Sequence, residues 1–333
     1  MSDRITLSHG DGGTKTNELI ENVFLKNYGE DIRNTINDSF VFHTDNRRLA
    51  FTTDSFIVKP LFFRGGDIGK LAICGTINDL AAAGAVPLYI SVGFIIEEGL
   101  DIDTLYRISK SMGEVCDEAG VKIVTGDTKV TEKGCTDGVY INTSGIGAVS
   151  EHYNTDIISP GDEIIITGSI AEHGTAILLD RYDLEIETDI ISDCNPLNNL
   201  ITGLDEELKS VKLMKDPTRG GLATVLNEIS KSSRLSISLD EILLPVKKQV
   251  RAVNEILGTD PLYLACEGRM VMVVRKGYGE RVLRKMMKIK NCAEAQIIGR
   301  FTKDTLGLVY MNTTIGGKRI VSSSEGQTVP RIC

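Results

Sequence analysis

Four aspartates stand beside Gly, Thr, Ser or Asn residues, where apolar strand patterns end or helical patterns begin. They are Asp54 in Thr-Thr-Asp-Ser, Asp79 in Thr-Ile-Asn-Asp-Leu, Asp127 in Thr-Gly-Asp-Thr-Lys and Asp216 in Lys-Asp-Pro-Thr-Arg. Mg²⁺ prefers oxygen ligands and usually binds through a few carboxylates together with nucleotide phosphates. One such Asp alone is typical of a helix cap or a turn. Four of them together favour a site for Mg²⁺ and a nucleotide.

A glycine-rich stretch near the N-terminus, Gly10 to Lys15, offers backbone N–H donors and one cation, as an anionic phosphate requires. The same composition also suits a flexible entry loop, and the residues alone do not decide between the two. The chain shows neither a P-loop nor a Rossmann fingerprint. The segment Gly65 to Lys70 has the wrong glycine spacing, and Leu71 follows its lysine where a P-loop needs Ser or Thr.

The seven cysteines show no C-x-x-C pair and no spacing typical of metal ligands. A scattered, odd-numbered set in a chain without a signal-peptide pattern indicates reduced thiols, most of them small apolar core residues. Cys333 differs because it is the last residue of the sequence. It follows a mostly polar segment whose composition predicts a mobile tail.

The composition limits the partners. The formal net charge of −9 argues against nucleic acid, whose phosphates are bound by an excess of Lys and Arg. No apolar run approaches the length that spans a bilayer, so we expect no membrane segment and a cytoplasmic protein.

The elements that must position these residues alternate irregularly between strand and helix patterns, which predicts an α+β fold with mixed sheets. A chain of 333 residues exceeds the usual size of one domain. The turn signal Ser159-Pro160-Gly161-Asp162 separates two such series. We expect an N-terminal domain over residues 1–155, a C-terminal domain over 156–316 and a flexible tail over 317–333. Fully extended, that tail would reach roughly 55 Å, enough to carry Cys333 to a distant site.

Several longer motifs resemble the hydrogenase maturation factors of the HypE family. The motifs are Gly66-Asp-Ile-Gly-Lys-Leu-Ala72, Cys74-Gly-Thr-Ile-Asn-Asp-Leu-Ala81, Val124-Thr-Gly-Asp-Thr-Lys-Val130, Asp216-Pro-Thr-Arg-Gly-Gly221, Ala265-Cys-Glu-Gly268 and Pro330-Arg-Ile-Cys333. The resemblance covers essentially the whole chain. The aspartate motifs are shared with aminoimidazole ribonucleotide synthetase, selenophosphate synthetase and thiamine phosphate kinase. The ending Pro-Arg-Ile-Cys is specific to HypE.

The resemblance implies a two-domain PurM-like fold and a homodimer that joins its N-terminal sheets. It also implies that the carbamoyltransferase HypF places a carbamoyl group on Cys333. ATP with Mg²⁺ then drives dehydration of that group to a thiocyanate, and the cyanide passes to iron on the HypC–HypD complex for a [NiFe]-hydrogenase.

For this reaction we expect each candidate residue to have a definite role. A base must remove the amide protons, and Lys129 and Glu267 are the candidates. They could instead bind phosphate or pair with an arginine. The remaining assignments are metal ligation by Asp54, Asp79, Asp127 and Asp216, nucleotide contacts by Lys15, Asp54, Asp79, Asp127, Thr128 and Arg219, and charge stabilisation by Arg219.

Two other classes of function stay open at this point. One is another ATP enzyme of the superfamily; selenophosphate synthetase would carry a reactive Cys in the N-terminal glycine-rich stretch, which holds none at positions 9–16. The other is a nucleotide-binding scaffold that exposes Cys333. Asp11, where the family commonly has Ala, is left out of the site because a carboxylate would repel phosphate. The sequence also leaves open whether the tail acts in cis or in trans.

Overall fold

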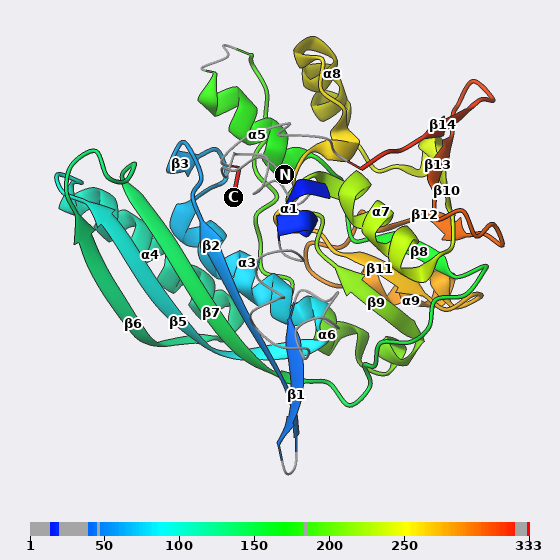
Figure 1. Ribbon diagram of the computed structural model, residues 1–333, viewed down its shortest axis with the longest axis horizontal. Helices are drawn as coiled ribbons and strands as arrows, with labels where there is room; N and C mark the ends of the chain where they lie inside the picture. Colours follow the sequence, from blue (N-terminus) through cyan, green and yellow to red (C-terminus); the bar gives the residue numbers. More distant parts are fainter. Residues whose placement is uncertain (1–13, 20–38, 45–46, 183–185, 324–331) are drawn as a thin grey trace.

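The computed structural model describes residues 14–19, 39–44, 47–182, 186–323 and 332–333, and it contains two large sheets (Figure 1). The first sheet has the strand order β1-β2-β7-β5-β6. Its strands are β1 (Phe40–Thr44), β2 (Arg47–Phe56), β5 (Ala85–Glu97), β6 (Lys122–Thr131) and β7 (Val139–Val149). Only the β5–β6 pair is parallel, so the sheet is mixed.

Two helices, α3 (Ile68–Ala82) and α4 (Ile102–Ala119), cover one face of this sheet. Helix α3 begins where the side chain of Asp67 accepts the free N–H groups of Gly69 and Lys70, at 2.7 and 3.1 Å. Almost all of α3 is buried, because the sheet, α4 and the second half of the chain surround it. The opposite face of the first sheet remains exposed.

The second sheet lies in the other half of the molecule, with the strand order β14-β13-β10-β12-β8-β11-β9. Its strands are β8 (Glu163–Ile166), β9 (Val211–Lys215), β10 (Ile237–Asp240), β11 (Val271–Val274), β12 (Gln296–Phe301), β13 (Val309–Asn312) and β14 (Lys318–Ile320). Only β10 and β13 pair in parallel. The fold is therefore α+β with two mixed sheets, as the sequence predicts.

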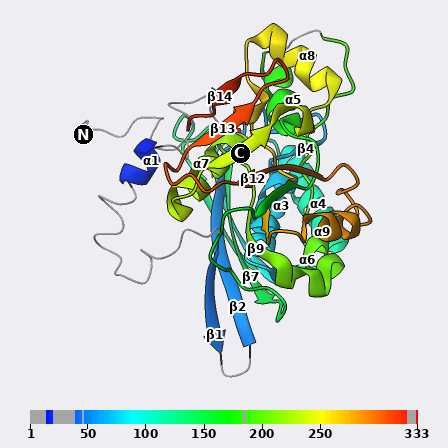
Figure 2. The same ribbon diagram turned by 90° about the vertical axis from the view of Figure 1, so that its right-hand side faces the viewer.

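Helices accompany the second sheet, namely α5 (Glu172–Arg181), α6 (Asn199–Leu204), α7 (Gly221–Ser233), α8 (Lys248–Leu257) and α9 (Gly279–Met286). Of these, α5 and α8 lie at the top of the molecule in Figures 1 and 2, whereas α6 and α9 lie lower. Two short elements, α1 (Thr14–Leu19) and the hairpin of β3 (Phe62–Phe63) with β4 (Gly66–Asp67), belong to the first half of the chain. Among the described helices, none combines the length and the apolar composition that a membrane crossing requires.

One buried amide of α3 joins the two halves. Asn78 donates from Nδ2 to the carbonyl oxygens of Asn195 and Glu267, at 3.2 and 3.0 Å, and its Oδ1 accepts from the N–H of Leu197 at 2.8 Å. These bonds satisfy the whole side chain inside the interface, where an unpaired amide would be costly. The Asn78 motif therefore has a clear structural role, which is to hold two loops of the second half against α3.

Three expectations drawn from the sequence need correction. The Gly-Asp-Thr-Lys run around Asp127 is not a turn after a strand, because β6 continues through it to Thr131. Asp54 is likewise inside β2, which ends only at Phe56. The segment after residue 316, expected to lack any element, contains strand β14 and the fully buried Val321.

Candidate active site

The last two residues of the chain dock between the two halves of the same molecule, where Figure 1 places the C-terminal end. The side chain of Ile332 is buried in the apolar cluster of the first half, which also contains Phe56 and Phe63. Nε2 of His173 lies 2.8 Å from the carbonyl oxygen of Ile332. The N–H of Ile57 donates to the backbone oxygen of Cys333 at 3.3 Å. Main-chain contacts on both sides thus fix where the Cys333 side chain points.

The Cys333 thiol is half-buried and lies in a mostly acidic environment. Its pKa is raised well above the ordinary value, first by burial and next by the negative charge of Glu267, with smaller contributions from Asp54 and Asp216. Arg219 is the group that opposes this shift. In this docked position Cys333 is a neutral thiol, because its surroundings disfavour the thiolate.

Glu267 stands on a tightly fixed loop before β11. Its N–H donates to Oδ1 of Asp193 at 3.2 Å, and its carbonyl accepts from Asn78. The next residue has to be glycine, since a Cβ atom at Gly268 would lie 1.9 Å from the carbonyl oxygen of Asp193. The main chain on both sides of the Glu267 side chain is therefore held in place.

The carboxyl group of Glu267 is buried, at 3% exposure, and its Oε1 has no hydrogen-bond partner within the described part of the chain. Burial raises its pKa well above the ordinary value, and Cys194, Asp216, Asp193 and Asp54 add to the shift. A buried carboxyl with an unused oxygen is costly, and such groups cluster at sites where a ligand or a reacting group completes them.

Arg219 is the cation that faces the thiol. It lies in the loop between β9 and α7, whose glycines Gly220 and Gly221 have φ values of +72° and +61° that only glycine adopts readily. The pKa of Arg219 is raised, first by Cys333 and also by Asp54, Glu267 and Asp216, while burial opposes the shift. The guanidinium therefore compensates a group of carboxyls that would otherwise repel one another.

Asp54 joins this group from the first half, on the face of β2 that α3 covers. Its pKa is raised because burial outweighs the charge of Arg219 and the hydrogen bond from the N–H of Ser55 at 2.8 Å. Asp79 on α3 accepts from the hydroxyl of Thr52 at 2.7 Å. Thr52 lies two residues before Asp54, roughly 7 Å along the strand. Both halves therefore contribute acidic groups to this region.

Asp127, Thr128 and Lys129 are placed elsewhere. They lie on the edge strand β6, where Lys129 and Asp127 form an exposed ion pair of 2.6 Å. That contact, together with the N–H of Thr128, lowers the pKa of Asp127. Asp127 is in register with Ser55 across β5 and β7, three strand spacings or roughly 14 Å away. Asp127 and Lys129 lie on the face that α3 and α4 leave open, whereas Thr128, in register with Phe94 and Ile141, points to the opposite face. This chain alone does not bring the three residues to Cys333.

The other predicted residues divide as follows. Asp216, Arg219, Glu267, Asp54 and Cys333 interact with one another, whereas Lys15 lies in the short helix α1 and is exposed. Residues 9–13 of the glycine-rich stretch lie outside the described residues.

Within the described ranges no three His, Cys, Asp or Glu side chains form a ready-made metal site. Mg²⁺ often binds through one or two carboxylates and substrate phosphates, so the predicted metal ligands stay a prediction.

The acidic group nevertheless fits a cation. Asp54 and Asp216 are half-buried, and each contributes to the raised pKa of Glu267 and of Cys333. A divalent ion bound by these two carboxylates would oppose that effect. The chemistry of the donor set, hard carboxylate oxygens, is what Mg²⁺ prefers.

Sequence reasoning missed His173 and Ser192, which contact the docked tail directly or through one bond. His173 falls in a glycine-containing loop that the sequence predicts between a strand over Glu163 to Thr167 and a helix over Thr175 to Arg181. The single available signal was that a histidine precedes the predicted helix at the end of an apolar strand and loop, which alone does not indicate a contact 159 positions away.

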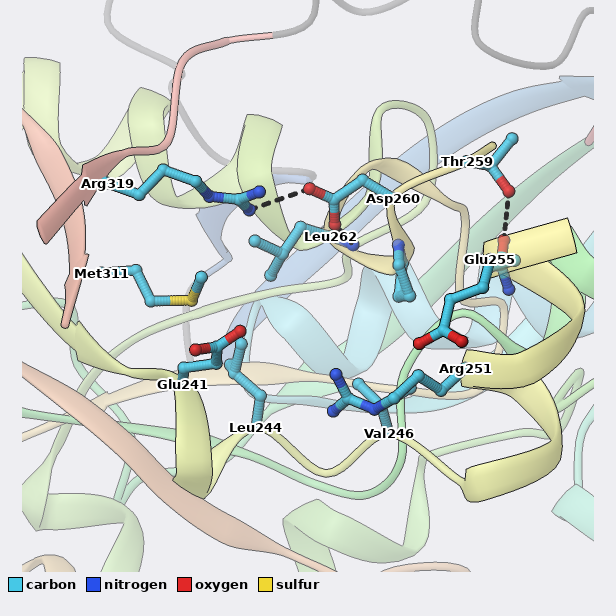
Figure 3. Close-up of a pocket in the computed structure, with 12 residues that line it drawn as sticks. Glu241, Leu244, Val246, Arg251, Glu255, Thr259, Asp260, Leu262, Met311 and Arg319 are labelled. Atoms are coloured by element: carbon cyan, nitrogen blue, oxygen red, sulfur yellow. Dashed lines mark hydrogen bonds and ion pairs between the residues drawn. The ribbon is translucent and has the colours of Figure 1, made fainter. Parts of the chain in front are cut away.

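A second concave region lies in the C-terminal half and is separate from Cys333 (Figure 3). It has a volume of about 230 Å³, and the ion pair between Arg319 and Asp260, 2.8 Å long, crosses its rim. Glu241, Arg251 and Glu255 supply further charges. None of the ten predicted site residues lines it, so the candidate active site remains the region around Cys333.

The class of protein follows from comparison with known families. The N-terminal domain model of the AIR synthase related proteins matches residues 37–149, and the C-terminal domain model matches residues 159–311. The chain therefore belongs to the AIR synthase related protein family.

Within that family the relatives are more specific. The carbamoyl dehydratase HypE of Rhizobium leguminosarum bv. viciae is 46% identical over 333 residues, covering 99% of this chain and 95% of the relative. A solved HypE–HypF complex contains a chain with 47% identity and a TM-score of 0.86, over 92% of this chain and 99% of that one. A HypE structure in complex with ATP has 41% identity and a TM-score of 0.82, over 99% and 100%. The chain is a member of the carbamoyl dehydratase HypE family.

Proposed function

We propose that the protein is an ATP-dependent dehydratase that converts a carbamoyl group on its own Cys333 into a thiocyanate, for the cyanide ligand of a [NiFe]-hydrogenase. The observation that supports this most strongly is that the tail docks between the two halves, held at the backbone by His173 and Ile57. There the Cys333 thiol is within electrostatic reach of Glu267, Asp54, Asp216 and Arg219. HypE relatives provide the reaction class, and the relative solved with ATP provides the cosubstrate.

The reaction balances with ATP as the acceptor of the lost water. The carboxamide oxygen takes the γ-phosphoryl group of ATP and later leaves as phosphate, while the nitrogen gives up both protons and the C≡N bond forms. Overall, S-carboxamide and ATP yield S-cyanide, ADP and phosphate. The amide oxygen needs this activation because it is otherwise a very poor leaving group.

Glu267 is the proton acceptor that the geometry favours. Its Oε1 has no partner in the described residues and its carboxyl is buried. Because its pKa is raised, its carboxylate, once ionised, is a stronger base than that of an ordinary glutamate. Arg219 would stabilise negative charge on the transferring phosphoryl group, in the way cationic side chains assist phosphoryl transfer. Lys129 stays the second candidate base.

Asp54 and Asp216 would hold Mg²⁺. Asp79, which accepts a hydrogen bond from Thr52, would add a third carboxylate on the α3 side of the metal. When bound, the metal would neutralise the charge of the ATP phosphates. Lys15, Asp127 and Thr128 remain proposed nucleotide contacts that the described part of one chain does not place beside Asp54.

A homodimer would account for the distant position of β6. The uncovered face of the first sheet carries a row of registered apolar side chains, Phe51, Ile146 and Tyr89, with Phe51 46% and Tyr89 49% exposed. Exposed apolar rows of this kind are typical of association surfaces. Two copies that pair through this face would place Asp127 and Lys129 of one copy toward the other, with Thr128 between them on the same edge strand, as the superfamily resemblance suggests.

The partners proposed for this chain are HypF, as source of the carbamoyl group, and the HypC–HypD complex, as acceptor of the cyanide. A HypE relative has been solved in complex with HypF. We expect the protein to work in the cytoplasm, without contact to nucleic acid or membrane.

Intact-mass spectrometry tests the proposal. The protein is mixed with HypF, carbamoyl phosphate, ATP and Mg²⁺. We expect a mass gain of one carbamoyl group, followed by loss of one water as ATP is consumed. Cys333→Ser should show neither change but should still bind ATP. A carbamoylated protein that turns over ATP without losing water would refute the dehydratase and leave a scaffold function.

A further inference from the structure

We propose that His173 is a positioning residue that holds the docked tail by the backbone of residue 332, so that the thiol of Cys333 faces Glu267 and Arg219. This inference rests on the proposed function, because the docked tail is there the form in which the cysteine-bound group reacts. It adds a role for a residue that neither the aspartate motifs nor the terminal Pro-Arg-Ile-Cys sequence indicates.

The hydrogen bonds around the imidazole select one tautomer. The hydroxyl of Ser192 accepts from the N–H of Cys194 at 3.0 Å, so its own proton is available for Nδ1 of His173, which lies 2.8 Å away. Nε2 then carries the ring proton and donates it to the carbonyl oxygen of Ile332 at 2.8 Å. Burial lowers the pKa of His173, so the ring is neutral and this tautomer is the one that fits both partners.

The ring is also fixed sterically. His173 is fully buried at the start of α5, and its ring meets the ring of Phe63 edge-on, with centroids 5.4 Å apart and an interplanar angle of 88°. The following residue, Gly174, packs so closely that a Cβ atom there would lie 2.8 Å from Cβ of Leu264. The donor is therefore held in place by the packing of its neighbours as well as by its hydrogen bonds.

Both halves of the molecule build this clasp. Ser192 donates its N–H to the carbonyl of Arg64 at 2.9 Å, and Arg64 is tied to Asp180 of α5 by its N–H and its Nε, each at 2.6 Å. Phe63 and Arg64 lie before α3 in the first half of the chain, whereas Asp180 and Ser192 belong to the second half. The tail carbonyl is thus received at a junction that is already crosslinked.

Besides the apolar packing of Ile332, the tail is held by two hydrogen bonds to its backbone. His173 binds the carbonyl of Ile332, and Ile57 binds the backbone oxygen of Cys333. Neither bond involves the Cys333 sulfur, so a group attached to that sulfur leaves both intact. Free, carbamoylated and cyanated tails should therefore dock in the same way, and the loss of His173 should lower the docked fraction of all three.

Alkylation of Cys333 measures docking without any catalysis. The parent is the full-length Cys135→Ser protein, since Cys135 is exposed whereas Cys74, Cys116, Cys194, Cys266 and Cys292 are buried. The probe is iodoacetamide, and the modified terminal peptide is quantified by mass spectrometry over time. We expect His173→Leu to raise the rate roughly 10-fold, the effect of losing one buried hydrogen bond to the tail.

His173→Gln keeps an N–H donor at a similar reach and should return the rate to within about 3-fold of the parent. Ser192→Ala removes the group that selects the tautomer and should give an intermediate rate. The matched control is His152→Gln, because His152 lies on another loop beside Glu151 and Asp205. Circular dichroism and thermal unfolding identify any variant that fails to fold.

Equal alkylation rates in the parent and His173→Leu would overturn the proposal, and so would a His173→Gln protein as reactive as His173→Leu. Should His173→Leu fail to fold, the order of the rates for parent, Ser192→Ala and His173→Gln decides the question. The assay needs neither ATP nor HypF. If the His173 variants change the alkylation rate but the protein forms no thiocyanate, the proposed function is refuted and the positioning role stands. If the protein forms thiocyanate but the alkylation rates are equal, the positioning role is refuted and the proposed function stands.

Discussion

The backbone N–H of Glu267 donates to the carboxylate of Asp193 across 3.2 Å, and that carboxylate also lies 3.5 Å from Nε of Arg269. Arg269 in turn binds Glu172 at 2.8 Å. Glu267 is thus placed by a buried polar network that holds its main chain, while its own Oε1 remains without a partner in the described residues. The network fixes the position of Glu267, and its unpartnered oxygen is available for the proposed proton transfer.

Replacing this oxygen tests the role of Glu267. In Glu267→Gln we expect HypF to carbamoylate Cys333 normally but the dehydration rate to fall about 100-fold or more, since an amide cannot accept the proton. Single-turnover kinetics followed by intact mass separates the two steps. Glu206→Gln, at an exposed glutamate, is the control. An unchanged dehydration rate would assign the base to another residue, with Lys129 next in line.

A second prediction concerns the glycine beside it. Gly268→Ala adds a methyl group 1.9 Å from the carbonyl oxygen of Asp193, a backbone atom that cannot move aside easily. We expect the free energy of unfolding to fall by about 3 kcal/mol, at the upper end for overpacking. Urea denaturation measures it. Gly113→Ala in α4 has open space around the new atom and should be neutral or stabilising. Equal stability of the two variants would contradict the close packing.

Glu172 gives a prediction for pH dependence. Burial alone would raise the pKa of Glu172, but hydrogen bonds from Lys247 and Ser169 and the charge of Arg269 outweigh it and lower the pKa below 4.5. A lowered folded-state pKa contributes stability above the unfolded value, and this contribution disappears as the pH falls through the folded-state pKa. Glu172→Gln should therefore cost about 3 kcal/mol at neutral pH, through the weakened contacts with Lys247 and the buried Arg269, and progressively less below pH 4.5.

Chemical denaturation over a pH series measures this difference. The matched control is Glu118→Gln, which removes an exposed ion pair with Lys290 and should change stability by less than about 1 kcal/mol. If the cost of Glu172→Gln stayed constant from neutral to acid pH, ionisation of Glu172 would not be the source of its contribution.

The exposed face of the first sheet predicts an effect on assembly. Phe51→Glu places a charge in the apolar row formed with Ile146 and Tyr89, and we expect it to shift the protein from dimer to monomer in sedimentation velocity. Ile315→Glu, at a highly exposed position between β13 and β14, should leave the mass unchanged. Thiocyanate formation should fall together with dimerisation. A Phe51→Glu protein that sediments like the parent would refute this interface.

Much of the architecture could be predicted because local patterns were strong. The apolar periodicity of α4 and the alternation along β7 correspond closely to the observed elements. Gly126-Asp127 was misread as a turn, since glycine usually ends a strand. Here a Cβ atom at Gly126 would lie 2.6 Å from the carbonyl oxygen of Val92, so close packing against β5, not a turn, accounts for the glycine.

The site could be predicted only in part, for a physical reason. Asp54, Asp216, Arg219 and Glu267 stand in motifs whose composition indicates ligand binding, and the fold does bring them to Cys333. His173 and Ile57 act through long-range contacts to the backbone of the tail, and any residue type at positions 332 and 333 offers the same carbonyl oxygens. Contacts to backbone leave no signature in the sequence of the partner segment.

The amide of Asn78 has a consequence for how the two halves can evolve and be engineered. One side chain of the first half holds the carbonyl of Glu267 and the loop of Asn195 and Leu197. The position of Glu267, the proposed proton acceptor, therefore depends on α3 and not only on its own sheet. A chimera that exchanges either half with a distant relative would inherit a base aligned to a foreign helix. Such hybrids should fold more readily than they react, unless Asn78 and its three backbone partners are exchanged as a unit.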